Sequence, residues 1–87
     1  MKVTKRNGNV VVYDDEKVVQ SILRANENTP GEEISERTAA YIAGVVFARL
    51  SAEEDLFTTA DVRECVYRTL REKDYFLTAE NYMAFRK

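Results

Sequence analysis

Positively charged side chains near the N-terminus are the residues best suited to bind an anion. Lys5 and Arg6 are adjacent, and Lys17 follows at the start of the next predicted element. Thr58 and Thr59 stand at another predicted helix start, where free backbone N–H groups and the helix dipole favour a phosphate. Composition and spacing alone make solubility charges on an edge strand the commoner role for Lys5 and Arg6. An anion site is the alternative.

Catalytic chemistry has little material in this sequence. There is no histidine, one cysteine, and no glycine-rich loop of the GxxxxGK[ST] or GxGxxG type. The clustered carboxylates, at residues 14–16, 32–33 and 53–55, fall at predicted helix starts or in loops, where capping and solvation explain them. Cys65 lies on a predicted apolar helix face, where cysteine acts as a small hydrophobe. We therefore expect no catalytic residue, no metal site and no enzymatic activity.

The composition indicates a single folded domain. The 87 residues have a formal net charge of −2, and 45% of them are hydrophobic, which suffices for a packed core. The longest apolar run, residues 39–48, is about half the ~20 residues that a membrane span requires, and no signal peptide opens the chain. These features predict a cytoplasmic protein. The low net charge disfavours nucleic acid as a partner.

A β-hairpin is predicted at the start of the chain. Two β-prone runs, residues 1–6 and 9–13, flank the pair Asn7-Gly8. Both residues of such a pair tolerate positive φ, which is what a two-residue hairpin turn requires. A lone hairpin is marginal in water, so this one must rest on the elements that follow.

The predicted turn determines which hairpin residues face each other. Val3 pairs with Val12, and Lys5 with Val10, so these side chains share one face. Arg6 then lies on the other face. Lys5 and Arg6 therefore meet one ligand only at the hairpin tip, where the turn and their long side chains let them converge.

Two helices are predicted in the middle of the chain. The first is capped by Asp14 and ends near Asn26. The second begins either at Thr29 or at Ser35 and runs to about Leu50. Its centre is apolar all round, which predicts the most buried element, and a glycine there suggests close approach by a neighbouring backbone.

The last third of the chain predicts a short extended piece and two more helices. Residues 56–57 could add a third strand beside the hairpin, Thr58 or Thr59 caps the third helix, and residues 75–85 form an aromatic-rich fourth helix. The expected fold is therefore α+β: a four-helix bundle capped by an N-terminal β-hairpin or a small three-stranded mixed sheet, with residues 1–87 as one domain.

Several segments together resemble a known family. Residues 3–8 read VTKRNG and residues 13–18 read YDDEKV, while residues 57–62 read FTTADV and residues 79–86 read AENYMAFR. This combination is similar to the ATP-cone, a nucleotide-binding regulatory domain of ribonucleotide reductases and of the repressor of their genes. The resemblance covers nearly the whole chain and makes nucleotide binding the favoured hypothesis.

The resemblance implies a fold, a ligand and a role. ATP-cones are four-helix bundles covered by a small mixed sheet, and they sense ATP against dATP and change how the protein assembles. The implied ligand is ATP or dATP, with or without Mg²⁺, and the implied partner is a reductase catalytic domain or a second copy. Many members have Glu where this chain has Val11. A protein-interaction module that has lost nucleotide binding is therefore the alternative.

The same resemblance implies a set of ligand-binding residues. The implied nucleotide-binding residues are Val3, Lys5, Arg6, Lys17, Thr59 and Arg63. The hairpin cations and Lys17 would contact the triphosphate, Thr59 would assist from the third helix, and Val3 would contact the adenine. Charge-assisted hydrogen bonds from lysine and arginine to a polyanion are strong, which agrees with this assignment.

Overall fold

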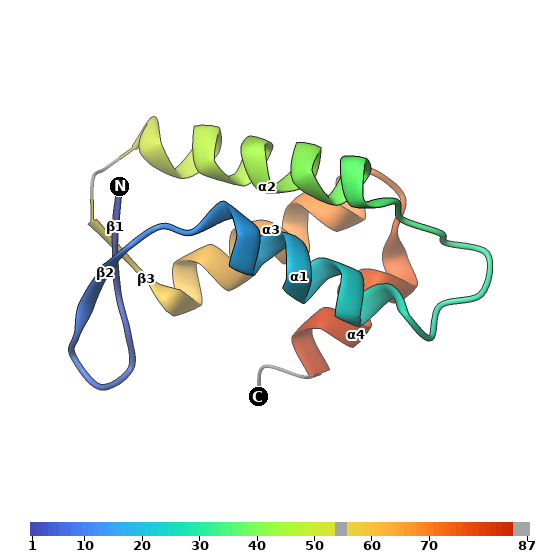
Figure 1. Cartoon of the computed structure of the whole chain (residues 1–87), viewed down its shortest axis with the longest axis horizontal. Coiled ribbons are helices and arrows are strands. Elements are labelled where there is room, and N and C mark those ends of the chain that lie inside the picture. Colours follow the sequence, from blue (N-terminus) through green and yellow to red (C-terminus); the bar gives the residue numbers. More distant parts are fainter. Residues whose placement is uncertain (54–55, 85–87) are drawn as a thin grey trace.

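A three-stranded sheet covers one end of a four-helix bundle (Figure 1). The computed structural model describes residues 1–53 and 56–84. The strands are β1 (Lys2–Thr4), β2 (Val10–Val12) and β3 (Leu56–Thr58); the helices are α1 (Asp15–Asn26), α2 (Glu36–Ser51), α3 (Thr59–Glu72) and α4 (Phe76–Ala84). This confirms the predicted α+β architecture. The predicted helical position 85 and the end of the segment 79–86 lie outside the described residues, as do positions 54–55 of one carboxylate cluster.

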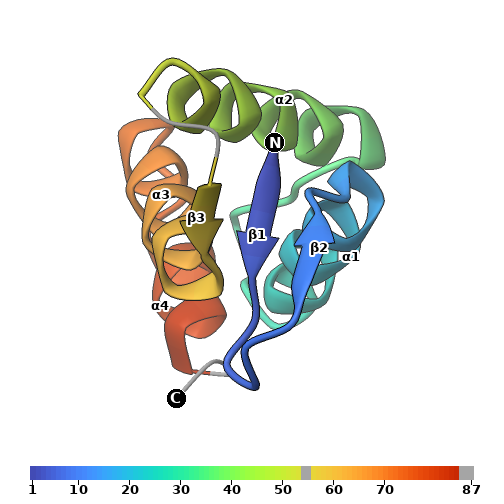
Figure 2. The same cartoon turned by 90° about the vertical axis from the view of Figure 1, so that its left-hand side faces the viewer.

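The sheet is mixed and has β1 at its centre (Figure 2). β2 pairs with β1 in antiparallel orientation, and β3 pairs with β1 in parallel orientation. Val3 and Phe57 are buried in the core from β1 and β3. The third strand predicted from residues 56–57 is therefore confirmed. The third strand and the packing on the helices give the hairpin the support that an isolated hairpin lacks.

The register between β1 and β2 differs by one residue from the predicted register. Val3 pairs with Val11, whereas the sequence predicted Val12 as its partner. Because strand side chains alternate between faces, Val3, Lys5 and Val11 share the inner face. Val10 and Val12 are left on the outer face, 54% and 72% exposed.

A three-residue loop accounts for this shift. The Lys5 N–H donates to the Asn9 carbonyl at 2.7 Å, and the Gly8 N–H donates to the Lys5 carbonyl at 2.9 Å. Gly8 has a φ of +90°, whereas Asn7 does not have a positive φ. This is the hairpin loop in which only the last residue is left-handed. The predicted two-residue turn, which needs positive φ at both residues, is wrong.

Side-chain caps begin α1 and α3 at the predicted positions. The Asp14 carboxylate accepts hydrogen bonds from the N–H groups of Glu16 and Lys17, at 3.0 and 3.4 Å. At α3, Thr58 accepts from the Asp61 N–H while the Asp61 carboxylate accepts from the Thr58 N–H, which forms a reciprocal capping box. Both helix N-termini are thereby fixed beside the sheet.

Helix α2 starts at the second of its two predicted positions. Ser35 is the N-cap and accepts from the Thr38 N–H at 3.1 Å. Thr29 does not start a helix: it is buried in the α1–α2 loop, where its hydroxyl donates to the Asn26 carbonyl at 2.7 Å. Gly31, with a φ of +88°, keeps this segment out of helical geometry.

Only one face of α2 is buried, although the centre of this helix is apolar all round. The opposite face is solvent-exposed and carries Tyr41 and Phe47, 60% and 40% exposed. Gly44 lies on this face, and no atom comes within 4 Å of the position that a Cβ would take. The expected close approach of a neighbouring backbone at this glycine is therefore absent. The buried residues of α2 are Ala39, Ile42, Ala43, Val46 and Leu50.

The helices form a closed ring in which α1 packs against α2 and α4, and α3 packs against α2 and α4. Tyr13, directly after β2, ties the hairpin to this ring. Its hydroxyl donates to the Ala43 carbonyl at 3.0 Å, and its ring centroid lies 5.5 Å from that of Phe47. Within the described residues, no helix combines the length and the apolar character needed to span a membrane.

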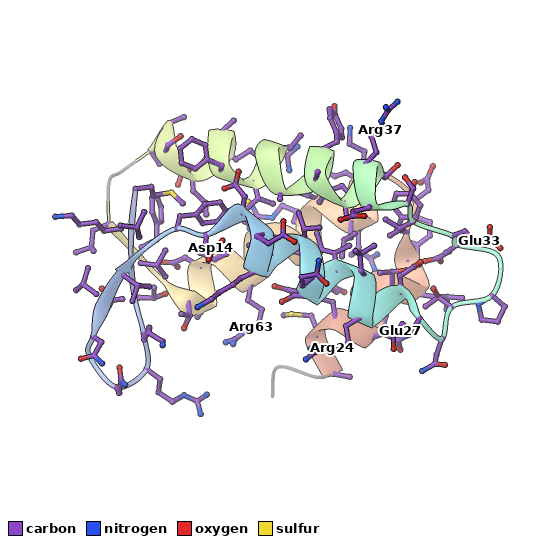
Figure 3. The ribbon with its side chains drawn as sticks, in the orientation of Figure 1. Asp14, Arg24, Glu27, Glu33, Arg37 and Arg63 are labelled. Carbon is purple, nitrogen blue, oxygen red and sulfur yellow. The ribbon has the colours of Figure 1, made fainter. Side chains whose placement is uncertain are left out.

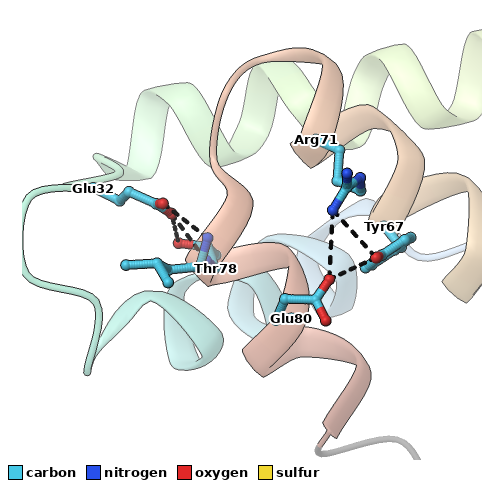
Figure 4. A network of polar contacts seen from close by, with 6 residues as sticks. Glu32, Tyr67, Arg71, Thr78 and Glu80 are labelled. Atoms are coloured by element: carbon cyan, nitrogen blue, oxygen red, sulfur yellow. Dashed lines mark hydrogen bonds and ion pairs between the residues drawn. The ribbon is translucent and has the colours of Figure 1, made fainter.

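The α1–α2 loop caps the start of α4 (Figure 4). The Glu32 carboxylate accepts hydrogen bonds from the N–H groups of Leu77 and Thr78 at 2.8 and 2.9 Å, and from the Thr78 hydroxyl at 3.0 Å. Desolvation raises the pKa of Glu32, but these three hydrogen bonds together outweigh it and lower the pKa below its ordinary value. A carboxylate that is distant in the sequence thus caps the N-terminus of α4 in place of a neighbouring residue.

Candidate functional site

A cavity of about 330 Å³ opens between the inner face of the hairpin and the first turns of α1 and α3. Its size lies at the lower end of the range of ligand pockets, roughly 300 to 1,000 Å³. Five elements, β1, β2, α1, α3 and α4, and the residues that flank them contribute to its wall. The wall residues are Val3, Lys5, Val11, Val12, Tyr13, Asp14, Lys17, Val18, Ser21, Thr59, Val62, Arg63 and Tyr82.

All of the predicted site residues except Arg6 lie on this wall. The structure therefore brings together residues from the hairpin, α1 and α3 that are far apart in the sequence. Arg6 belongs to the loop 6–8 at the hairpin tip and does not line the cavity. Lys5 lies on the inner face because it follows the buried Val3 by two positions, whereas Arg6 is part of the loop 6–8.

Helical spacing gathers the residues from α3 into one cluster. Thr59 is the first residue of α3, and Val62 and Arg63 follow it by three and four positions, which places all of them on one face. The same rule applies in α1, where Ser21 follows Lys17 by four. The sequence prediction missed Ser21 and Val62, although this spacing could have indicated both. Figure 3 shows Arg63 extending from α3 toward the lower side of the molecule.

The wall carries more positive than negative charge. Lys5, Lys17 and Arg63 have no ion pair or side-chain hydrogen bond within residues 1–53 and 56–84. Asp14 is the acidic residue of the wall, and one of its carboxylate oxygens is already engaged in capping α1. Three cations without partners around one cavity create an attractive potential for a multiply charged anion.

The start of α3 adds hydrogen-bond donors to these charges. Thr58 and Asp61 satisfy each other in the capping box, so the helix start is held in place without a ligand. The N–H group of Ala60 belongs to the first turn and has no acceptor inside the helix, whereas the Thr59 N–H points to the Thr4 carbonyl in the parallel ladder between β1 and β3. Such N–H groups, together with the helix dipole, favour a phosphate.

The remaining wall is largely apolar. Val3, Val11, Val18 and Val62 contribute aliphatic side chains, and the rings of two tyrosines complete this part of the wall. Because burial raises the pKa of the Tyr13 hydroxyl, this group stays protonated at neutral pH. An apolar surface beside a cationic one suits a ligand with a flat, uncharged ring and a charged tail. Tyr82, from the aromatic-rich helix α4, is both buried and part of this wall.

A larger cavity, of about 630 Å³, lies between the end of α2 and α3 but has a different charge balance. Its cations are already paired: Arg49 with Glu72 at 2.5 Å, and Arg68 with Glu64 at 3.4 Å. Further carboxylates on its wall make it a poor anion site. Cys65 also lines it, and desolvation raises the pKa of this thiol, which disfavours the reactive thiolate.

The described residues contain no group of three or more His, Cys, Asp or Glu side chains arranged to hold a metal ion. The hydrogen-bonded carboxylates, such as Glu32 and Asp61, cap helices instead.

Comparison with known proteins identifies the family of this domain. The family model of the ATP cone domain matches residues 1–87, which is the whole chain. The chain therefore belongs to the ATP-cone family, whose members are non-catalytic regulatory domains that sense nucleotides and bind ATP or dATP as allosteric effectors. A search of curated proteins found no match to the chain.

Proposed function

We propose that the cavity between the hairpin, α1 and α3 is the nucleotide site of this ATP-cone domain, and that ATP or dATP binds there as an allosteric effector. One observation carries this proposal: Lys5, Lys17 and Arg63, all without partners in the described structure, meet at the start of α3 beside an apolar wall. This arrangement matches the two halves of an adenine nucleotide, a triphosphate and an uncharged base.

Each wall residue has a defined role in the proposed complex. The three cations neutralise the triphosphate, with Arg63 able to bind two phosphate oxygens at once. Thr59 contributes its hydroxyl from the first turn of α3, where the helix dipole also favours a phosphate. Val3 provides apolar contact to the adenine. Arg6 is left out of this site because it lies in the loop outside the wall.

The proposed role is regulation by population shift. A nucleotide that contacts the hairpin, α1 and α3 together favours the conformation in which those elements are closed around it. We propose that this change controls a ribonucleotide reductase, or a protein that regulates one, in the cytoplasm. The output is a change in assembly, with a second copy or a catalytic domain as the partner.

Thermal unfolding with and without nucleotide tests the proposed function. Because a ligand that binds only the folded state stabilises it by mass action, nucleotide at a hundred times its Kd should add about 2.7 kcal/mol of stability. ATP or dATP should therefore raise the Tm, and Lys17→Ala should reduce the rise at the same nucleotide concentration. A Tm that responds to neither nucleotide would favour the alternative of a protein-interaction module that has lost its ligand.

A further inference from the structure

The sheet has an open edge at β2, which is the outermost strand beside β1 (Figure 2). The Tyr13 N–H donates to the Met1 carbonyl at 3.0 Å, so Tyr13 faces β1. In an antiparallel pair the residues that bond across the ladder alternate, and Val11 is therefore the next one to face β1. It follows that the backbone N–H and C=O groups of Val10 and Val12 point away from β1, toward the open side.

Apart from its short length of three residues, this edge lacks the features that usually prevent strand pairing. Natural edge strands are protected by charged side chains, proline or bulges. β2 instead consists of three valines, Val10, Val11 and Val12, all of them exposed. It therefore offers both unpaired backbone groups and apolar side chains to an incoming strand.

We propose that a second copy of this chain pairs with this edge, β2 against β2 in antiparallel orientation, so that two sheets join into one around a two-fold axis. Pairing centred on Val11 sets Val10 of one copy opposite Val12 of the other. Each such pair exchanges two backbone hydrogen bonds, and symmetry repeats the pair. The exposed valines then lie side by side on the outer face, where cross-strand aliphatic pairs are stabilising.

The charges that flank β2 identify a second copy as the partner. The loop before β2 carries Arg6, and the first turn of α1 after it carries Asp15 and Glu16. Antiparallel pairing brings the loop of each copy beside the first turn of α1 in the other. Neither Arg6 nor Asp15 forms an ion pair within residues 1–53 and 56–84. The symmetric pairing supplies a partner for both, twice per dimer.

The interface is small, so the dimer is weak and depends on concentration. Interfaces below ~1,200 Å² belong to transient complexes. Sedimentation velocity on the whole chain, without nucleotide, at chain concentrations from about 10 μM to about 1 mM detects a dimer with a Kd in that range. We expect a monomer–dimer equilibrium that weakens as salt is added, because the end contacts are ionic. A chain that stays monomeric over the whole range would overturn the proposal.

A pair of substitutions at Val10 separates backbone pairing from simple apolar contact. Val10→Pro removes an N–H that points away from β1, so it spares the hairpin and should raise the dimer Kd by about tenfold or more. Val10→Thr keeps that N–H and the β-branched shape, and it should still dimerise. Circular dichroism confirms that both variants are folded. Dimerisation of Val10→Pro with the wild-type Kd would contradict the pairing.

A charge exchange tests the partner and the orientation. Arg6→Asp and Asp15→Arg should each weaken the dimer, because each places like charges together at both ends of the interface. The double variant restores opposite charges and should recover the wild-type Kd to within about threefold. A double variant as weak as the single variants would exclude the antiparallel β2 interface.

Discussion

Val3 on β1 faces Val11 on β2, and both side chains line the cavity between the hairpin and the helices. Lys5 follows Val3 by two positions and so falls on the same face. Arg6 enters the loop instead. The burial of Val3, together with the alternation of side chains along the strand, thus determines which of two adjacent cations reaches the proposed nucleotide site.

The first prediction concerns these neighbouring cations. Lys5→Ala should lower ATP affinity about tenfold or more, since one charge-assisted hydrogen bond is lost. Arg6→Ala serves as the matched control and should change affinity by less than about threefold, because only a screened, longer-range charge is removed. Isothermal titration calorimetry measures both. Equal losses in the two variants would mean that the hairpin tip, not its inner face, binds the triphosphate.

The sequence predicted the parts of this fold that local chemistry determines. Asp14 and Thr58 are capping residues that precede apolar helical patterns, and both cap a helix as predicted. The hairpin register was not predictable in the same way, because Asn7-Gly8 is compatible with more than one loop. The observed pairing places Tyr13 on the inner face with Val3, where both are buried, whereas the predicted register would place Tyr13 on the opposite face.

Tertiary contacts also explain the other differences between the predicted and the observed structure. Thr29 followed by proline has the spacing of a helix start, yet its hydroxyl and that of Thr78 bond each other in the interior, and Ser35 starts the helix. The candidate site was predictable to the extent that the family motif marks its residues. Tyr82 is brought to the cavity by the packing of α4, a tertiary contact that helical spacing within α1 or α3 does not indicate.

A second prediction concerns the link between Tyr13 and α2. Tyr13→Phe removes the hydrogen bond to the Ala43 carbonyl and should lower the free energy of unfolding by about 1 kcal/mol at pH 7. Desolvation, with a smaller contribution from Asp15, raises the pKa of Tyr13 in the folded state. Its contribution to stability is therefore complete below the unfolded tyrosine pKa, about 10, and decreases as pH rises above it.

Urea denaturation of wild type and Tyr13→Phe at pH 7 and at about pH 11 measures this effect, because the unfolded tyrosine ionises between them. The difference in stability between the two proteins should be smaller at the higher pH. A difference that stays constant would show that the hydroxyl is not responsible for the stabilisation.

A third prediction concerns the Glu32 cap of α4. Glu32→Gln should lower the free energy of unfolding by about 1 kcal/mol at pH 7, because an amide nitrogen cannot accept from the N–H groups that the carboxylate satisfies. The folded pKa of Glu32 is lowered, so its contribution is present above the unfolded pKa and is lost as pH falls through the folded pKa.

Urea denaturation at pH 7 and at about pH 3 checks the sign of this effect. Glu32→Gln and wild type should approach each other in stability in acid, where both carry an uncharged side chain. Glu33→Gln is the matched control, since Glu33 caps no helix in the described structure. If Glu33→Gln showed the same pH dependence, general charge and not the cap would be the cause.

A fourth prediction compares two glycines with opposite backbone requirements. Gly44→Ala should raise stability by about 0.5 to 1 kcal/mol, because the residue is helical and has open space around the Cβ position. Gly8→Ala should lower stability by about 1 kcal/mol although its space is also open, because φ is +90° there. Thermal unfolding of both variants distinguishes conformational strain from steric contact. A stabilised Gly8→Ala would contradict the observed hairpin loop.

Calorimetric titration of the chain with ATP and with dATP tests the central claim most directly. The wild type should bind at least one of them saturably, and Arg63→Ala should weaken binding about tenfold or more. Arg37→Ala should bind as the wild type does, because Arg37 lies on α2, on the upper side of the molecule and away from Arg63 (Figure 3). Absence of binding to either nucleotide, or equal loss in the two arginine variants, would contradict a nucleotide site in the cavity between the hairpin, α1 and α3.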